Sequence, residues 1–280
     1  LPNSDTRLED IITILPMAGA GSRFAMKGYQ QPKPLLPIDG KPMVVQAVEC
    51  LPASGKIIFI TLEEHIKNYP TLIPELEKIT FNTTSNTPYN PEIHITTIPN
   101  ITQGQAITCK IGIEYGISRD IMSLDSPILI SACDNGVYWN SPEYQQLLDD
   151  VNVDVIVWSF RNNQTSKINP QMYAWLDVDD TGLIKHVSCK KFDYSKDPLK
   201  THAIIGTMFF RKARYFLDGL ERNIQEGITT NGEYYVDDVI NQNIKDGLKV
   251  KVFEVNNYIC WGTPNDYLTY NYWKNYFTKQ

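Results

Sequence analysis

The stretch LPMAGAGSRFAMKGYQQPKPLLPIDGKPMVV, Leu15 to Val45, is the part of the sequence around which the rest of the chain is organised. The apolar residues from Ile11 to Leu15 read as a buried parallel strand that leads into it. A loop with Gly19 and Gly21 follows. Glycines at such positions let backbone N–H groups approach phosphate oxygens without an intervening Cβ atom. By itself this loop is typical of a plain strand-to-helix turn.

Two cations after the loop change that interpretation. Arg23 follows the second glycine closely, and Lys33 lies between two prolines. Both would add fixed positive charge where a triphosphate would lie, so the combination favours a phosphate site. Two other phosphate motifs are excluded. A dinucleotide fingerprint would have a third glycine where Phe24 stands, and a Walker loop would continue with Gly-Lys-Ser/Thr, which does not follow here.

Taken together, the motifs of this stretch resemble the opening of a known enzyme family. Gly-x-Gly-Ser-Arg-Phe, Gly-Tyr-x-x-Pro-Lys-Pro-Leu and Gly-Lys-Pro-Met are similar to the start of nucleotidyltransferases that activate sugar phosphates and related phosphorylated metabolites. The GYxxPKPL form is similar to cytidylyltransferases of surface-polysaccharide precursors. The resemblance implies that the loop binds the nucleotide. The residues concerned are Met17, Ala18, Gly19, Ala20, Gly21 and Ser22.

Apolar strand-like runs alternate with helical patterns along most of the chain. The runs lie at 56–62, 93–98, 127–133, 153–160, 204–210 and 249–255. This alternation predicts an α/β fold with a doubly wound, mostly parallel, Rossmann-like sheet, whose ligand crevice lies at the carboxyl ends of the strands. The turn signal at 179–182 predicts a hairpin, as part of a small β-rich subregion that binds the acceptor.

We expect a single domain over residues 1–280, which resembles the nucleotidyltransferase family along nearly its whole length. The nucleotide-binding half would span about 11–150 and the acceptor-binding half about 151–280. Leu1 is not an initiator methionine, as expected for a piece excised from a longer chain.

The segment Gln103, Gly104 and Gln105 opens a predicted helix directly after a strand. Its polar side chains and free helix N–H groups would lie at the crevice edge. The family carries a similar segment there that helps to hold the base, and a plain helix N-terminus is an equally good interpretation.

Asp134 is the strongest candidate for a metal ligand. It ends the apolar strand PILISAC, where a Mg²⁺ ligand would be needed beside a triphosphate. An Asp-Asn-Gly turn without any ligand is the structural alternative. A second ligand is harder to place, because Cys260 stands where the family commonly has another carboxylate, and a thiol suits Mg²⁺ poorly. Water, Asp266 or the 233–238 region would have to supply it.

Three residues of the second half inherit acceptor-binding roles from the resemblance. Lys190, with Lys191 beside it, falls where a family lysine binds the acceptor phosphate, although the neighbouring glutamate and proline of the family motif are missing. Solvated lysines at a strand end are the alternative. Gly206 lies in a family-like Gly-Thr segment, and Glu233 falls where a family carboxylate binds acceptor hydroxyls.

Composition excludes several other classes of protein. A net charge of −6 over 280 residues argues against a nucleic-acid-binding protein. The sequence contains no run of about 18 apolar residues, which is the length that a membrane-spanning helix needs. The polar, acidic opening at 1–10 and the five scattered cysteines predict a cytoplasmic protein. The aromatic run at 267–277 would pack on the body or on the partner subunit of a homo-oligomer.

These observations predict a Mg²⁺-dependent nucleotidyltransferase. Lys33 would lie near the α-phosphate of a nucleoside triphosphate, with CTP favoured, and Arg23 would bind the departing pyrophosphate. The phosphorylated small-molecule acceptor stays open among a sugar 1-phosphate, phosphocholine, a phosphorylated amino-acid derivative and a polyol phosphate. Two alternatives are a nucleotide-sugar-dependent glycosyltransferase of related fold and a regulatory domain that binds nucleotide without turnover.

Overall fold

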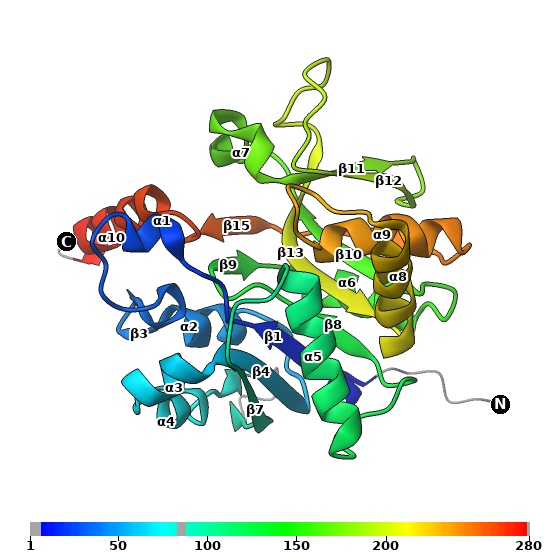
Figure 1. The fold of residues 1–280 in the computed structure, drawn as a ribbon. Helices are drawn as coiled ribbons and strands as arrows, with labels where there is room; N and C mark the ends of the chain where they lie inside the picture. The colour runs from blue at the N-terminus through cyan, green and yellow to red at the C-terminus, as the bar shows by residue number, and fades with distance from the viewer. Residues whose placement is uncertain (1–6, 83–87, 279–280) are drawn as a thin grey trace.

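A nine-stranded sheet forms the centre of the molecule (Figure 1). The computed structural model describes residues 7–82 and 88–278. Seven strands follow one path in the order β12-β11-β13-β8-β1-β4-β7, and β10 and β14 continue from β13. The strands are β1 (Ile12–Pro16), β4 (Lys56–Leu62), β7 (Glu92–Ile98), β8 (Ile128–Ile130), β10 (Val155–Phe160), β11 (Ala174–Val178), β12 (Ile184–Cys189), β13 (His202–Phe210) and β14 (Val250–Glu254).

Most of these strands run in one direction, as the sequence predicts. The pairs β1–β4, β1–β8, β4–β7 and β10–β14 are parallel. Strand β13 is antiparallel to β8, β10 and β11, and β12 is antiparallel to β11. The α/β class and the mostly parallel sheet are therefore confirmed, and β11 and β12 form the predicted hairpin.

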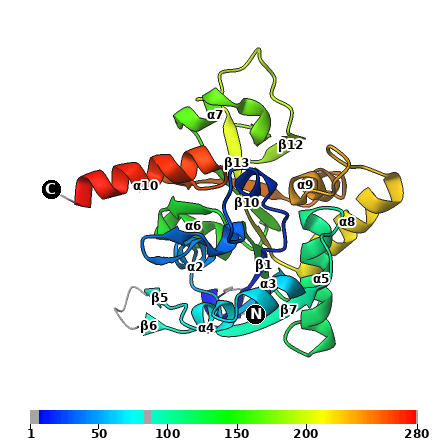
Figure 2. The ribbon, with the colours of Figure 1, turned by 60° about the vertical axis from the view of Figure 1, so that its left-hand side comes forward.

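Helices cover both faces of the sheet (Figure 2). Ile12 and Ile14 of β1 pack with α5 (Gln105–Ser118), α8 (Ala213–Glu226) and α9 (Val236–Lys245) on one face. Leu15 points to the other face, with α2 (Met43–Glu49) and α4 (Leu72–Leu76). Successive strand residues face opposite sides, so one apolar run supplies both cores. Each fully buried Ile or Leu side chain contributes roughly 1.5–3 kcal/mol.

The central strand that was predicted to end next to Asp134 is shorter than the sequence suggests. The predicted strand at 127–133 ends at Ile130. The chain bends at 133–134 and starts a new strand, β9 (Asn135–Tyr138), which pairs antiparallel with β15 (Asn257–Cys260). The structure thus has a strand where an Asp-Asn-Gly turn was the alternative. Gly136 is needed there, because a Cβ atom would come to 2.9 Å from the Trp261 ring.

The remaining elements are short or peripheral. Pro70 separates α3 (Glu63–Asn68) from α4, as expected from a proline within a helical pattern. The helix α6 (Ser141–Asp149) covers the sheet near β10. The others are η1 (Leu8–Asp10), α1 (Ser22–Ala25), η2 (Lys33–Leu35), β2 (Pro37–Ile38), β3 (Lys41–Pro42), β5 (Phe81–Asn82), β6 (Pro88–Tyr89), α7 (Gln164–Ile168), η3 (Pro170–Met172) and α10 (Pro264–Thr278).

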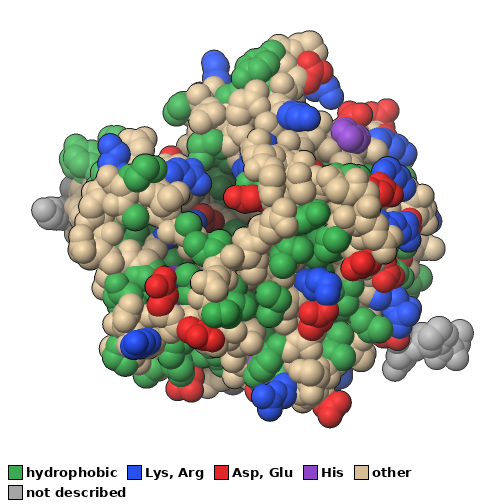
Figure 3. All heavy atoms as spheres, in the orientation of Figure 1, with side chains coloured by type: hydrophobic (Ala, Val, Ile, Leu, Met, Phe, Trp, Pro, Cys, Tyr) green, Lys and Arg blue, Asp and Glu red, His purple; other side chains and the backbone are tan. Residues whose placement is uncertain are grey.

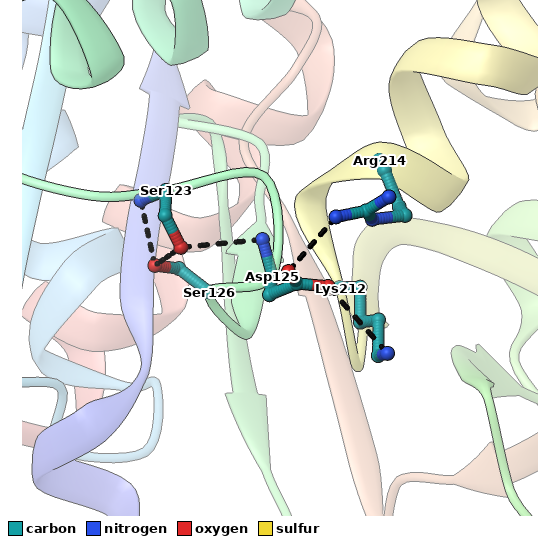
Figure 4. A network of polar contacts seen from close by, with 5 residues as sticks. All are labelled: Ser123, Asp125, Ser126, Lys212 and Arg214. Carbon is teal, nitrogen blue, oxygen red and sulfur yellow. Dashed lines mark hydrogen bonds and ion pairs between the residues drawn. The ribbon is translucent and has the colours of Figure 1, made fainter.

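A polar network ties the loop before β8 to the start of α8 (Figure 4). Asp125 accepts a hydrogen bond from Arg214 at 2.8 Å and pairs with Lys212 at 3.5 Å. The hydroxyl of Ser126 accepts a bond from the Ser123 amide. This network is exposed and lies at the amino end of β8, away from the strand ends where a ligand is expected.

Within the described residues, no helix is long and apolar enough to cross a membrane. Residues 1–6, which form part of the opening that predicts a cytoplasmic protein, lie outside the described ranges. The helix α10 extends away from the body in Figure 2. It leaves an apolar and aromatic surface exposed, made of Leu268, Tyr272, Trp273, Tyr276 and Phe277.

Candidate functional site

The glycine loop leaves the carboxyl end of β1 and lines a cavity. Met17 and Ala18 are buried, and the Met17 amide donates to the Ile60 carbonyl oxygen at 2.8 Å, which fixes the start of the loop. Gly21 has a φ of 57° and stands immediately before α1. Left-handed backbone of this kind favours glycine, so the sequence folds here into a tight turn whose backbone faces the cavity.

The cavity beside this loop has a volume of about 340 Å³. Figure 3 shows a hollow on this face of the molecule, with charged side chains at its edge. The structure brings together there most of the residues predicted to bind nucleotide. The described residues that line it are Pro16, Met17, Ala18, Gly19, Ala20, Gly21, Lys33, Pro34, Ile101, Thr102, Gly104, Gln105, Thr108, Ala132, Cys133, Asp134 and Glu233.

An ion pair between Lys33 and Asp134 forms the polar centre of this cavity. The Lys33 ammonium donates to Asp134 Oδ2 at 2.6 Å, and both side chains are partly buried. Burial alone would raise the pKa of Asp134, but Lys33 and, more weakly, Arg23 hold it below its usual value. Burial likewise disfavours charged Lys33, yet Asp134 raises its pKa. Both groups therefore stay ionised at neutral pH.

The amino end of α5 closes one side of the cavity through a contact with residues from 233 to 235. The Tyr234 amide donates to the Gln103 carbonyl at 2.9 Å, and the Ala106 amide donates to the Tyr234 carbonyl at 3.0 Å. A Cβ atom on Gly104 would come to 2.5 Å from Tyr234 O, so the segments can approach this closely only at a glycine. The contact places Glu233 on the first cavity, away from the predicted acceptor residues.

A second cavity of about 170 Å³ adjoins the first, and Asp134 and Gln105 line both. Arg23, Lys190 and Gly206 line only the second. Gly206 has a φ of 83°, which favours glycine. A Cβ atom there would lie 3.2 Å from Ala132 Cβ, so glycine also lets the backbone approach Ala132 closely. The rest of the lining is Met172, Tyr173, Ala174, Ile204, Ile205, Tyr235, Asp237, Tyr258, Cys260 and Gly262.

Lys190 is held at the wall of this second cavity. Its backbone has a φ of 55°, and its ammonium donates to the Met172 carbonyl. The same ammonium lies 5.4 Å from the centre of the Tyr235 ring, a cation–π contact. Its positive charge opposes the rise that burial gives the pKa of Asp237, and it adds to the effect of Lys33 and Arg23, which hold the pKa of Asp134 below its usual value.

The residues around Asp134 fit a Mg²⁺ ion that is shared with substrate phosphates. Mg²⁺ keeps several waters and often takes only one or two protein carboxylates. A Cβ atom at position 262 would come to 3.0 Å from Asp134 Oδ2, so Gly262 leaves the space beside that oxygen open. Among the described residues, no group of three or more His, Cys, Asp or Glu side chains could hold a metal ion, so waters and substrate phosphates would have to supply the other ligands.

Neither Cys260 nor Asp266 is well suited to be a second Mg²⁺ ligand. Burial, with the nearby carboxylates, raises the pKa of the Cys260 thiol to about 12, so it stays protonated. Asp266 accepts a hydrogen bond from the Thr263 hydroxyl at 2.5 Å, and its amide donates back to that hydroxyl at 3.2 Å. This reciprocal pair caps the start of α10, which gives Asp266 a structural role.

The structure does not bring every predicted residue to the cavities. Ser22 and Gln103 are absent from both linings, and Gln103 instead donates to the Gly232 carbonyl at 3.4 Å. Arg23 lies on the second cavity with Lys190 rather than on the first. Sequence reasoning missed several lining residues, because hydroxyl, thioether and aromatic side chains alone gave no signal: Thr102, Thr108, Met172, Tyr173 and Tyr258.

Comparisons with known proteins establish the fold. No family model matches the sequence, and a search of curated proteins found no relative. Among solved structures, a nucleoside-diphosphate-sugar pyrophosphorylase from Vibrio cholerae RC9 is 18% identical, with a TM-score of 0.71 over 92% of this chain and 98% of that chain.

Two further structures show the same likeness. The inositol-1-phosphate CTP transferase from T. maritima is 14% identical, with a TM-score of 0.63 over 93% of each chain. A Bacillus anthracis protein provisionally assigned as a glucose-1-phosphate thymidylyltransferase, solved with sucrose, is 18% identical, with a TM-score of 0.66 over 93% of this chain and 94% of that chain.

Proposed function

We propose that this protein is a nucleotidyltransferase that transfers a nucleoside monophosphate to a phosphorylated small molecule and releases pyrophosphate. The observation that carries the proposal is the junction of two cavities at Asp134, one lined by the glycine loop and Lys33, the other by Arg23 and Lys190. A nucleotide in the first cavity and an acceptor in the second would meet at that junction. Most residues that line the first cavity lie in the proposed nucleotide-binding half, about 11–150, and most that line the second lie in the proposed acceptor-binding half, about 151–280. Each half also supplies residues to the other cavity, Arg23 and Asp134 to the second and Glu233 to the first.

The reaction needs alignment and charge compensation more than a protein nucleophile. An oxygen of the acceptor phosphate forms a bond to the α-phosphorus while the bond from that phosphorus to the bridging oxygen of pyrophosphate breaks. The acceptor phosphate is already ionised near neutral pH. Lys33 would neutralise charge that develops on the α-phosphate. Arg23, which lines the second cavity, would hold phosphate oxygens on that side of the junction.

Asp134 would hold Mg²⁺ together with the phosphates of the nucleotide. The ion would supply Lewis-acid compensation of phosphate charge. Lys33 donates to Asp134 Oδ2, so its ammonium lies beside the carboxylate that would hold the ion and would be within reach of a phosphate bound there. Replacing Asp134 by Asn would then raise the Mg²⁺ concentration needed for half-maximal turnover, and an unchanged requirement would place the ion elsewhere.

We favour CTP as the nucleotide. The GYxxPKPL form of residues 28–35 supports it, as does the likeness in fold to a protein described as an inositol-1-phosphate CTP transferase. Another structure of the same fold is assigned as a thymidylyltransferase, so the fold does not select the base.

Pyrophosphate release tests the reaction class directly. The purified protein would be mixed with Mg²⁺, each nucleoside triphosphate in turn, and a panel of phosphorylated alcohols and sugars, while pyrophosphate is followed with a coupled enzyme assay. We expect release that requires both substrates. Nucleotide binding without release under any combination would instead favour a regulatory nucleotide-binding domain. A separate mixture with a nucleotide sugar and a sugar acceptor tests the other alternative, because release of nucleoside diphosphate there would favour a glycosyltransferase.

A further inference from the structure

The second cavity contains a carboxylate that the proposed chemistry leaves unused. Asp237 lies in the first turn of α9 and lines this cavity together with Arg23 and Lys190. In the described residues, the only side-chain hydrogen bond to its carboxylate comes from Cys189 Sγ, at a long 4.0 Å. Its neighbour Asp238 is different, since it is buried and accepts a bond from the Thr230 hydroxyl at 2.9 Å.

Asp237 is therefore a poorly partnered carboxylate that faces a ligand cavity. Burial raises its pKa to about 6, against the opposing effect of Lys190. It is ionised at neutral pH, at some cost in stability. A partly buried charge of this kind is stabilised when a ligand brings a complementary donor or a cation.

Three tyrosines, Tyr173, Tyr235 and Tyr258, line the same cavity. The Tyr173 hydroxyl is engaged within the protein, since it donates to Thr165 Oγ1 at 3.2 Å. The three rings add aromatic surface to the cavity wall.

Aromatic rings beside a carboxylate are suited to a cation. Ring quadrupoles attract ammonium groups, most strongly where water is excluded, and aromatic cages recognise quaternary ammonium ligands. The ammonium of Lys190 already lies over the Tyr235 ring, so this wall accommodates such a contact. Met172, Ala174, Ile204 and Ile205 add apolar side chains to the lining, which methyl groups on a nitrogen would contact.

We propose that the acceptor is a phosphorylated ammonium compound, with its phosphate held by Arg23 and Lys190 next to Asp134 and its ammonium group held by Asp237 among the tyrosine rings. This inference rests on the proposed function, because it assigns the second cavity to the acceptor. It narrows the acceptor class from sugar, polyol and amino-alcohol phosphates to those that carry a positive charge.

Binding of matched ligands tests the assignment without any turnover. Isothermal titration calorimetry would compare phosphocholine with 3,3-dimethylbutyl phosphate, which keeps the phosphate and the shape but replaces the ammonium nitrogen by an uncharged carbon, and with phosphoethanolamine and myo-inositol 1-phosphate. We expect phosphocholine or phosphoethanolamine to bind at least tenfold more tightly than the two ligands without an ammonium group. Tighter binding of phosphocholine than of phosphoethanolamine would assign a quaternary ammonium, and the reverse order a primary one.

Two variant pairs test the residues. Asp237→Asn should remove most of the preference for the charged ligand, while Asp218→Asn, an exposed aspartate on α8, should leave it intact. Tyr235→Leu should weaken ammonium binding severalfold, and Tyr235→Phe should preserve it. Equal affinity for phosphocholine and 3,3-dimethylbutyl phosphate, or an unchanged preference in Asp237→Asn, would overturn the proposal. Absent pyrophosphate release with tight ammonium binding would instead refute the proposed reaction alone.

Discussion

The ion pair of Lys33 and Asp134 joins two residues that the sequence assigns to different tasks. Both were predicted at one phosphate site, from a proline-flanked lysine and from an acid at a strand end. The 2.6 Å contact between them was not predicted, because it joins two segments 101 residues apart in the chain and depends on the tertiary fold. The pair keeps two partly buried charges compensated until a substrate provides other partners.

Loss of either cation should abolish most turnover without unfolding the protein. We expect Lys33→Ala and Arg23→Ala each to lower kcat by about 10²–10³, the usual effect of removing a charge-stabilising donor. Lys27→Ala is the matched control, since Lys27 is exposed and lines neither cavity. Steady-state kinetics and circular dichroism would be measured together. Rates within a few-fold of the parent for both variants would contradict the assignment.

Asp237 should make stability depend on pH in an unusual direction. Its pKa is raised to about 6 in the folded protein, above the usual value near 4, so folding favours its protonated form. This contribution is fully present below about pH 4 and is lost as the pH rises through about 6.

Asp237→Asn should remove that dependence. We expect the variant to be more stable than the parent at pH 7.5 by roughly 1–3 kcal/mol, and the difference to shrink toward pH 5. Urea unfolding at pH 5, 6 and 7.5 would measure it. A variant that is less stable at pH 7.5 would show that Asp237 makes a stabilising contact in the free protein.

At the scale of elements, long apolar runs were predicted well and short pairings were not. The strand at 56–62 has the predicted bounds, because it is apolar almost throughout and is buried on both faces. The pair β9–β15 was missed, since Asn135 and Gly136 are typical of turns. Their strand conformation is imposed by distant residues, including the Trp261 ring against Gly136.

The junction between α5 and the 233–235 segment predicts a strong effect of Gly104→Ala. The added Cβ atom would meet Tyr234 O at 2.5 Å, in a backbone with a φ of 120°. We expect a loss of unfolding free energy above about 2 kcal/mol, together with weaker nucleotide binding, because backbone strain and a steric clash add.

Gly28→Ala is the control for that substitution. Its φ is 84°, but no atom lies within 4 Å of the added Cβ, so it reports the backbone cost alone, about 1 kcal/mol. Chemical denaturation would compare the two variants. Equal losses would mean that the Tyr234 contact relaxes at little cost.

At the scale of the whole molecule, the alternating runs were sufficient to predict the class of fold. Most of the residues that the sequence assigns to the nucleotide line one cavity, and their role stays a prediction. The division of the site into two cavities could not be predicted, because it depends on where Arg23, Glu233 and Tyr235 lie after their loops fold. Loop geometry depends on tertiary contacts and carries no periodic signal in the sequence.

Nucleotide binding should stabilise the whole molecule in a base-dependent way. We expect CTP with Mg²⁺ to raise Tm more than GTP, ATP or dTTP does. At one hundred times the Kd the gain is about 2.7 kcal/mol, or about 5 °C for a domain of this size. Differential scanning fluorimetry at one nucleotide concentration would rank the four. A larger shift with a purine nucleotide would overturn the choice of base and leave the reaction class standing.

The pairing of β9 with β15 also has a consequence for biosynthesis. On the ribosome, residues 135–138 emerge well before their partner at 257–260. At 5–20 residues per second the interval is roughly 6 to 25 seconds. During that time a nascent chain carries the glycine loop and Lys33 but exposes the edge of β9, an open strand that other chains or chaperones could pair with. Completion of the candidate site is thus a late event, which coincides with the arrival of the last strand.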